Sequence, residues 1–359
     1  MTLNESCDIN LAGMPIKTIA DVPFLLEVQD SGANASAWAE RYSDDVQTFL
    51  AERGALLIRG LRVHGSEQFG KILSTLFGSE LLEYTYRSTP RTALRGNVYT
   101  ATEYPASQVI PQHNENSYAR TWPNRIGFLC LVPPQSEGET PIGSSRKIYE
   151  SLPSAIREKF ETKGVMYVRN YSTIDLPWSE VFQTSDKAKV EEYCFKNGLK
   201  CTWTSDDGLR TTQVNPATAI HPVSGEVIWF NQAHLFHYSS LRTDIAATLI
   251  DNVGENNLPR NVYFGDGSPI DLKDLEIIRQ HYERTKIKFP WKKSDLLLLD
   301  NMLFTHGREA YTGPRKILTG MACPNVPLAA TEQSQEPPLL TGHFSDGQHH
   351  LAPHCGDGT

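Results

Sequence analysis

Two histidines, one glutamate and one arginine, carried by two segments far apart in the sequence, are the residues best suited to chemistry. His113 and Glu115 belong to the segment IPQHNENSY, and His306 belongs to DNMLFTHGR. Arg315 follows His306 by nine residues. Two imidazoles and one carboxylate on one face of a metal ion leave three of its positions open, which suits Fe(II) sites that react with oxygen. The arginine can bind a carboxylate beside the metal through two parallel hydrogen bonds.

The spacing of these residues predicts how they would meet. On an extended strand, residues i and i+2 point to the same face, so His113 and Glu115 would converge on one metal while Asn114 points away. His306 follows the apolar segment 295–300, which reads as a buried strand, so we expect it at a strand end or in the next turn. Arg315 opens a further apolar run.

A structural role for the same residues stays open at this point. An isolated His-X-Glu arises by chance in many sequences, and a histidine in a turn is usually structural. The order of the four residues favours a metal site beside a carboxylate site, but their spacing alone does not decide it.

The elements that position these residues are helices at the front of the chain and in insertions, with strands in the middle and at the end. We expect a helix over 36–52 with Ser36 as its N-cap, and a second helix capped by Ser66. The remaining elements are expected as an irregular, pocket-shaping stretch over 80–112, strands near 55–58, 126–132, 166–169, 225–230, 295–300 and 315–323, and helices within 147–163, 185–197 and 271–286. This pattern fits a mainly β fold with flanking helices, a double-stranded β-helix or jelly roll.

Composition and charge exclude several classes of protein. The chain has 359 residues and a formal net charge of −8, with no basic run of the kind that follows phosphates, so we expect no nucleic acid partner. Its six cysteines form no Cys-X-X-Cys pair, which is typical of a reducing cytoplasm. The polar N-terminal segment predicts no signal peptide, and no apolar run approaches the length of a membrane span, so we expect a cytoplasmic location and no membrane contact.

The last part of the chain changes in character. Residues 326–359 are rich in Pro, Gly, Ser, Gln and His, which predicts a flexible tail behind a single catalytic domain over 1–325. The tail contains a group of possible metal ligands, but a surface tail explains them more simply: His349, His350, His354 and Cys355.

Long stretches of the chain resemble one enzyme family. The sequence resembles the Fe(II)/2-oxoglutarate dioxygenases of the taurine dioxygenase superfamily, and within it the syringomycin-biosynthesis aspartyl hydroxylase-like branch. The resemblance covers roughly residues 15 to 325, in the order of the family's own segments. The matching stretches are 54–63, 99–118, 122–153, 221–237, 259–270 and 296–321.

The resemblance implies a role for each matching position. His113, Glu115 and His306 would bind Fe(II), and Arg315 would bind the distal carboxylate of the co-substrate 2-oxoglutarate with help from Thr140; O2 would be the oxidant. Glu115 argues against halogenation, because related halogenases replace this carboxylate with a small residue. Many relatives also carry a second arginine four residues after the first, where this chain has Thr319. A substrate group bound by that arginine in relatives would need another partner here.

The resemblance also implies a small-molecule substrate. The branch acts on amino acids or their derivatives, free or tethered to a carrier protein, in natural-product pathways, so we expect hydroxylation of an unactivated C–H bond. Desaturation, cyclisation, a non-amino-acid carboxylate substrate, and an inactive jelly-roll binding protein stay open as alternatives, and the oligomeric state is not predicted. Candidate substrate contacts are Asn114, Asn116, Ser117, Tyr118, Arg120 and His234. The arginines that precede the metal segment, Arg91 among them, are further candidates for a substrate carboxylate.

Overall fold

The computed structural model describes most of the chain up to residue 325. Contacts gather Met1–Val326 into one compact unit. The tail expected over 326–359, with its histidines, lies outside the described residues and stays a prediction. The described ranges are 9–29, 34–83, 86, 91–101, 104–172, 174–204 and 207–325.

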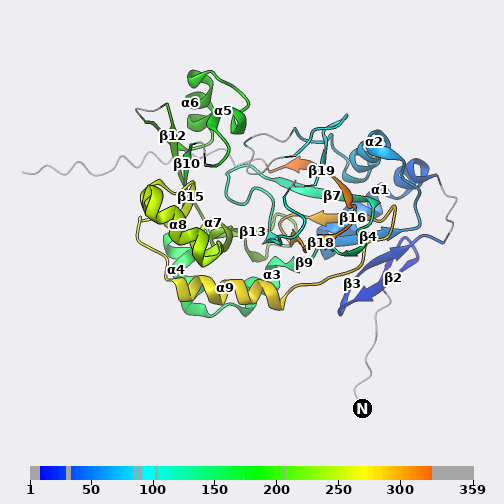
Figure 1. The fold of residues 1–359 in the computed structure, drawn as a ribbon. Coiled ribbons are helices and arrows are strands. Elements are labelled where there is room, and N and C mark those ends of the chain that lie inside the picture. The colour runs from blue at the N-terminus through cyan, green and yellow to red at the C-terminus, as the bar shows by residue number, and fades with distance from the viewer. Residues whose placement is uncertain are drawn as a thin grey trace, which may run out of the picture. The chain divides into compact units, whose positions relative to one another are not determined.

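An eight-stranded sheet forms the larger wall of the fold (Figure 1). Its strands are antiparallel except for the parallel pair β3–β4. In spatial order they are β1 (Asn10–Leu11), β2 (Met14–Ile19), β3 (Val22–Glu27), β4 (Ala55–Arg59), β16 (Leu296–Asp300), β7 (Pro123–Val132), β19 (Lys316–Pro324) and β5 (Val98–Thr100).

Both faces of this sheet are buried, which explains the unbroken leucine run of β16. Leu296 and Leu298 pack with helices α1 (Ala35–Arg53) and α2 (Gly65–Phe77), which cover the outer face. Leu297 and Leu299 point to the opposite face and join a second cluster. Because successive strand residues alternate between faces, one run of leucines serves two cores.

A three-stranded sheet faces the inner side of the larger one. It consists of β6 (Ile110–His113), β17 (Phe304–Arg308) and β9 (Ile142–Ser144), with β17 in the middle. Phe128 of the large sheet belongs to the same buried cluster as Ile142 and Phe304 of the small one. A short pair, β8 (Ser136–Glu137) with β18 (Tyr311–Thr312), completes this end. The predicted mainly β jelly roll with flanking helices is confirmed.

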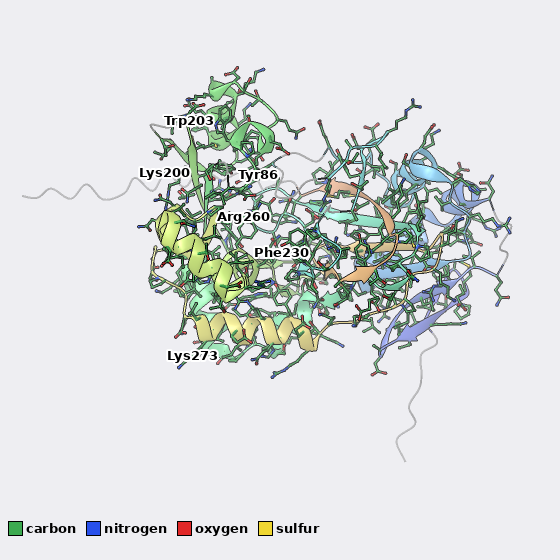
Figure 2. The ribbon with its side chains drawn as sticks, viewed as in Figure 1. Tyr86, Lys200, Trp203, Phe230, Arg260 and Lys273 are labelled. Atoms are coloured by element: carbon green, nitrogen blue, oxygen red, sulfur yellow. The ribbon has the colours of Figure 1, made fainter. Side chains whose placement is uncertain are left out.

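A four-stranded sheet and the helices packed on it form a second layer of structure, here called the helical module. Tyr86, from the segment before β5, packs on this module: its ring centroid lies 5.5 Å from those of both Phe182 and Tyr193 (Figure 2). The core of the helical module is aromatic, and the ring of Phe160 contacts those of Trp229 and Phe264. The four strands are β10 (Val165–Tyr171), β11 (Lys200–Trp203), β12 (Leu209–Asn215) and β15 (Arg260–Phe264), and a separate pair consists of β13 (Thr218–Ile220) and β14 (Val227–Trp229). The helices of this part of the chain are α3 (Ser145–Ser151), α4 (Ser154–Lys163), α5 (Trp178–Val181), α6 (Lys187–Lys196), α7 (Ala233–Phe236), α8 (Thr243–Val253) and α9 (Leu272–Arg284).

The two predicted helix caps at the front of the chain are wrong. Asn34 caps α1, because its Oδ1 accepts the backbone N–H of Ser36 at 3.0 Å and lies nearer the free amides of the first turn. Helix α2 begins at Gly65 after His64, so Ser66 lies inside its first turn. In the described residues, no helix is long and apolar enough to cross a membrane.

Candidate metal centre

Two neighbouring strands of the small sheet bring the two histidines together. His306 on β17 is directly opposite His113 on β6, and their ring centroids are 4.6 Å apart. His306 lies in the middle of its strand and is buried, so the expectation of a strand end or turn is wrong. Directly opposite residues of an antiparallel pair share one face, and this register makes both imidazoles point at one place.

The glutamate reaches the same place by a different route from the one its spacing predicts. Strand β6 ends at His113, and Glu115 lies in the turn that follows, not on the strand. The side chain of Asn301 holds it there: Oδ1 accepts the Glu115 N–H at 2.7 Å, and Nδ2 donates to the Glu115 carbonyl at 2.9 Å. Asn116, with φ of 57°, turns the chain immediately afterwards. A side-chain clamp, and not strand alternation, therefore aims the carboxylate.

The three side chains form a compact donor set. One ligand atom from each of His113, Glu115 and His306 lies within 4.8 Å of the others. Glu115 Oε2 lies 3.6 Å from His306 Nε2 and 2.7 Å from Arg91 Nη2. His113 Nδ1 lies 2.8 Å from the Pro111 carbonyl; a donated hydrogen bond there leaves the Nε2 lone pair for a metal.

The protonation states also suit a divalent cation. Desolvation in the pocket, and then His306, lower the pKa of His113 to about 4, so its imidazole is neutral near pH 7. Burial by itself would raise the pKa of Glu115, but Arg91, His306 and His113 together bring it below its usual range. A neutral His113 imidazole and an ionised Glu115 carboxylate are donors that suit Fe(II).

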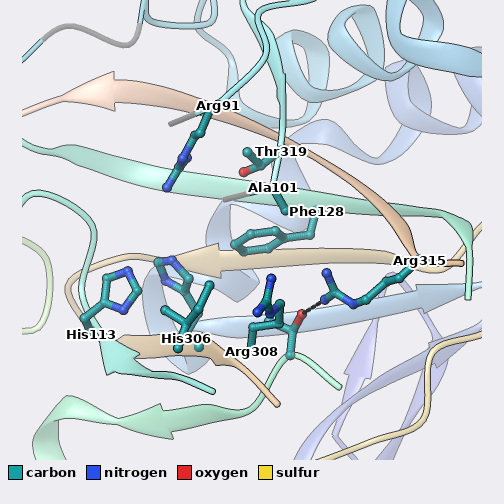
Figure 3. A pocket seen from close by; sticks show the side chains of 11 residues that line it. Arg91, Ala101, His113, Phe128, His306, Arg308, Arg315 and Thr319 are labelled. Atoms are coloured by element: carbon teal, nitrogen blue, oxygen red, sulfur yellow. Dashed lines mark hydrogen bonds between the residues drawn. The ribbon is translucent and has the colours of Figure 1, made fainter. Parts of the chain in front are cut away.

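A guanidinium and a hydroxyl lie at the other end of the same pocket (Figure 3). Arg315 Nη2 donates to Thr140 Oγ1 at 3.3 Å, and Arg315 Nε donates to the Gly138 carbonyl at 2.9 Å. Burial, and then Arg308, lower the pKa of Arg315 to about 10, which keeps it cationic at neutral pH. The pocket is lined by Arg91, Ala101, Ile110, His113, Phe128, Thr140, His306, Gly307, Arg308, Arg315 and Thr319.

Sequence reasoning missed Arg308, which lies two residues after His306 on the same strand. The side chain is buried and donates to the carbonyls of Tyr104 at 2.8 Å, Pro105 at 2.7 Å and Gln108 at 2.8 Å. It thus fixes the segment that leads into β6 beside the pocket. The signal was present, since i and i+2 on a strand share a face.

Three of the candidate substrate residues build the turn around Glu115. Asn114 is buried, and its Nδ2 donates to the Asn301 carbonyl at 2.6 Å and to Ser145 Oγ at 3.0 Å. Ser117 Oγ donates to the Asn114 carbonyl at 3.1 Å. Asn116 accepts from the Tyr118 hydroxyl at 3.2 Å. None of these residues is among those that line the pocket.

The other three candidates lie farther into the helical module. The ring of Tyr118 packs against that of Phe236, with the two centroids 5.0 Å apart and the rings tilted. Arg120 lies beside Gly198, where an added Cβ would come within 2.4 Å of its guanidinium carbon. His234 is stacked at 3.9 Å on Tyr282 and lines a different cavity. These three also lie outside the lining of the metal pocket.

Asn301 gives a direct test of the clamp. Replacing it by leucine removes three buried hydrogen bonds, to the N–H and carbonyl of Glu115 and to the carbonyl of Pro123. We expect the metal-free protein to lose about 3 kcal/mol or more of unfolding free energy in urea. Fe(II) affinity should fall by about 10- to 100-fold, as for residues that orient metal ligands. The same change at the exposed Asn257 is the control, and an unchanged Fe(II) affinity in Asn301→Leu would contradict the clamp.

His234 predicts a pH dependence of stability. Burial, and then Arg279 and His113, lower its pKa to about 3 in the fold, although its hydrogen bond with the Gln112 carbonyl opposes the shift. His234 therefore takes up a proton at a higher pH in the unfolded chain than in the folded one. The free energy of unfolding should fall as the pH drops below about 6.5. In urea unfolding between about pH 7 and pH 5, His234→Gln should flatten the slope by up to roughly 1.4 kcal/mol per pH unit. As a control, substitution of the exposed Gln280 by alanine should leave the slope of unfolding free energy against pH unchanged. Equal slopes in His234→Gln and the wild type would refute the role of His234 in this pH dependence.

Comparison with known proteins agrees with this geometry. Residues 20–322 match the family model described as taurine catabolism dioxygenase TauD, TfdA family. The dapdiamide synthesis protein DdaC of Enterobacter agglomerans is 36% identical over 312 residues, covering 87% of this chain and 94% of that protein.

Two solved structures share the fold. PvcB, an Fe, alpha-ketoglutarate dependent oxygenase from an isonitrile synthetic pathway, superposes with a TM-score of 0.51 at 15% identity, over 86% of this chain and 90% of that one. Asparagine oxygenase, in complex with Fe(II), 2S,3S-3-hydroxyasparagine and succinate, superposes with a TM-score of 0.52 at 12% identity, over 83% and 92%. The chain belongs to the TauD, TfdA family and is a 2-oxoglutarate-dependent dioxygenase whose cofactors are Fe(II), 2-oxoglutarate and O2.

Proposed function

We propose that this dioxygenase hydroxylates an unactivated C–H bond of an amino acid or amino-acid derivative in natural-product biosynthesis. One observation carries the proposal: His113 and His306, which form one donor set with Glu115, line the same pocket as the Arg315–Thr140 pair. In it, His113, Glu115 and His306 hold Fe(II), and Arg315 with Thr140 binds the distal carboxylate of 2-oxoglutarate. The reaction takes place in the cytoplasm.

The relatives support the substrate class. DdaC is named for the synthesis of dapdiamide, and it aligns with 87% of this chain. The asparagine oxygenase structure contains a hydroxylated amino acid together with succinate. Both point to a small amino-acid-like substrate, either free or presented by a carrier protein.

The side chains of this protein would bind the metal, orient the co-substrate and keep water out of the pocket. When bound, Fe(II) with 2-oxoglutarate supplies the activation of O2 that the side chains cannot provide. His113 presents its Nε2 lone pair because Nδ1 faces the Pro111 carbonyl. Phe128 packs 5.2 Å from His306 and, with Ile110, gives the pocket an apolar wall that protects a reactive centre from water. Arg315 fixes the co-substrate at the far end through its planar fork.

Product analysis tests this proposal. Purified enzyme is incubated in air with Fe(II), 2-oxoglutarate and each member of a panel of amino acids and other small carboxylates, and succinate and products are measured by mass spectrometry. We expect one amino acid or a small group to stimulate succinate formation and to gain one oxygen atom. His306→Ala should form neither product. Loss of two hydrogens would instead indicate desaturation or cyclisation, and succinate stimulated only by carboxylates that are not amino acids would overturn the substrate class.

A further inference from the structure

Arg91 lies at the metal end of the pocket. Of the three arginines that line the pocket, it is the one that donates to the proposed metal ligand Glu115. It comes from the segment before β5, is buried, and its Nη2 donates to Glu115 Oε2 at 2.7 Å. Figure 3 shows its guanidinium reaching down toward the two histidines, with Thr319 between it and Arg315. The protein thus holds a carboxylate-binding fork next to the metal donors, and the carboxylate it now binds is the protein's own.

Thr319 is a second polar residue that lines the same pocket and could bind a ligand there. It lies on β19, four residues after Arg315, and its side chain is fully buried in the pocket lining. Its hydroxyl finds no hydrogen-bond partner among the described residues. A buried hydroxyl without a partner costs free energy that a bound ligand can recover. Thr319 is therefore placed to donate to an acceptor that lies between it and Arg91.

The charges in the pocket favour an anionic ligand there. Three arginines line it (Arg91, Arg308 and Arg315), whereas no carboxylate does. Glu115 is bonded to Arg91 from behind the lining, and Glu139 offsets part of the charge of Arg315. A divalent cation adds positive charge at the end where Arg91 lies, while the two carboxylates of 2-oxoglutarate offset only that addition. A further anion beside Arg91 would reduce the remaining excess.

We infer that Arg91, with the Thr319 hydroxyl, binds a free carboxylate of the substrate. This rests on the proposed function and narrows it: the substrate is an amino acid whose carboxyl group is free, and not one held through that group as a thioester on a carrier protein. Arg91 serves as a specificity-determining residue whose guanidinium can bind a carboxylate, as its Nη2 already binds Glu115 Oε2. A neutral carboxamide would offer the guanidinium a hydrogen-bond acceptor without a charge, which makes a weaker hydrogen bond than a carboxylate does.

The test compares acids with their neutral isosteres in the anaerobic complex of the enzyme with Fe(II) and 2-oxoglutarate. The probes are the proteinogenic L-amino acids and the corresponding amino-acid amides, and binding is read from the perturbation of the visible charge-transfer band. In the wild type, the best acid should bind about 30-fold or more tightly than its amide, as expected when one partner of a charged pair is lost. Arg91→Gln should reduce this ratio to within about threefold, and Arg91→Lys should restore part of it.

Two further variants complete the design. Thr319→Val keeps the shape and removes the hydroxyl, so the acid-to-amide ratio should fall by about fivefold. Arg95→Gln changes an exposed arginine of the same segment and should keep the wild-type ratio. Thr319→Val and Arg91→Lys keep the inference testable if Arg91→Gln does not fold.

The outcomes separate this inference from the proposed function. Equal binding of acids and amides by the wild type, or a band perturbed by no member of the panel, would overturn the inference while leaving the oxygenase intact. If Arg91→Gln binds no Fe(II), or forms no band, Arg91 acts through Glu115 and the inference is again overturned. Absence of the band in the wild type would contradict the proposed function itself.

Discussion

Glu115→Ala should lose Fe(II)-dependent turnover of 2-oxoglutarate and should bind Fe(II) at least about 100-fold more weakly than the wild type. The side chain is the one carboxylate in the donor set, and no other carboxylate is placed to replace it among the described residues. Fe(II) binding to the anaerobic protein is measured by calorimetry, separately from turnover. The exposed Glu137→Ala is the matched control.

The same substitution has a second consequence for the metal-free protein. Removing Glu115 leaves Arg91 buried without the carboxylate at 2.7 Å, and breaking a buried pair in this way costs about 3–5 kcal/mol. Urea unfolding should therefore show Glu115→Ala to be clearly less stable than the wild type before any iron is added. Full Fe(II) affinity in Glu115→Ala would remove this residue from the metal centre.

Arg315→Met should raise the concentration of 2-oxoglutarate needed for half-maximal turnover by about 100-fold. The methionine keeps the apolar bulk and removes the fork that bonds Thr140 and the Gly138 carbonyl. Fe(II) affinity without co-substrate should stay within about threefold of the wild type, because Arg315 lies at the far end of the pocket from the donors. A weakened affinity for 2-oxoglutarate together with an unchanged affinity for Fe(II) distinguishes loss of the carboxylate-binding arginine from misfolding of the protein.

Arg146→Met, which breaks a pair with Glu226 away from the pocket, is the control for Arg315→Met. Thr140→Val should show the same effect in weaker form, since it removes one hydrogen bond and no charge. An unchanged requirement for 2-oxoglutarate in Arg315→Met would exclude this residue as the anchor of the distal carboxylate.

The strands and helices that could be predicted are those with strong local patterns. Segment 295–300 is strand β16 because a short apolar run bounded by turn residues has few other solutions, and Gly54 ends α1 in a left-handed conformation. The strands β1 to β3 are absent from the sequence-based prediction: β1–β2 and β2–β3 pair locally, and only β3 pairs with the more distant β4. Competing caps such as Asn34 and Ser36 are also decided by the position of the first turn, which sequence leaves within a residue or two.

The donor types could be identified from the sequence, but the way they meet could not. His113 and Glu115 were expected to share a strand face; in the structure, His306 is the cross-strand neighbour and Asn301 holds Glu115 in a turn. No local signal marks Asn301 as a clamp, since its partners are about 180 residues away. The pairing of Arg91 with Glu115 depends on tertiary structure in the same way.

Anaerobic titration of Fe(II) and then 2-oxoglutarate into the metal-free enzyme, followed by visible absorption, tests the central claim most directly. We predict a weak charge-transfer band that forms only when both are present, because the three donors leave adjacent positions for a chelating co-substrate. The band should be absent in Glu115→Ala and should need far more 2-oxoglutarate in Arg315→Met. A folded wild-type protein that binds Fe(II) and 2-oxoglutarate without forming the band would contradict the account.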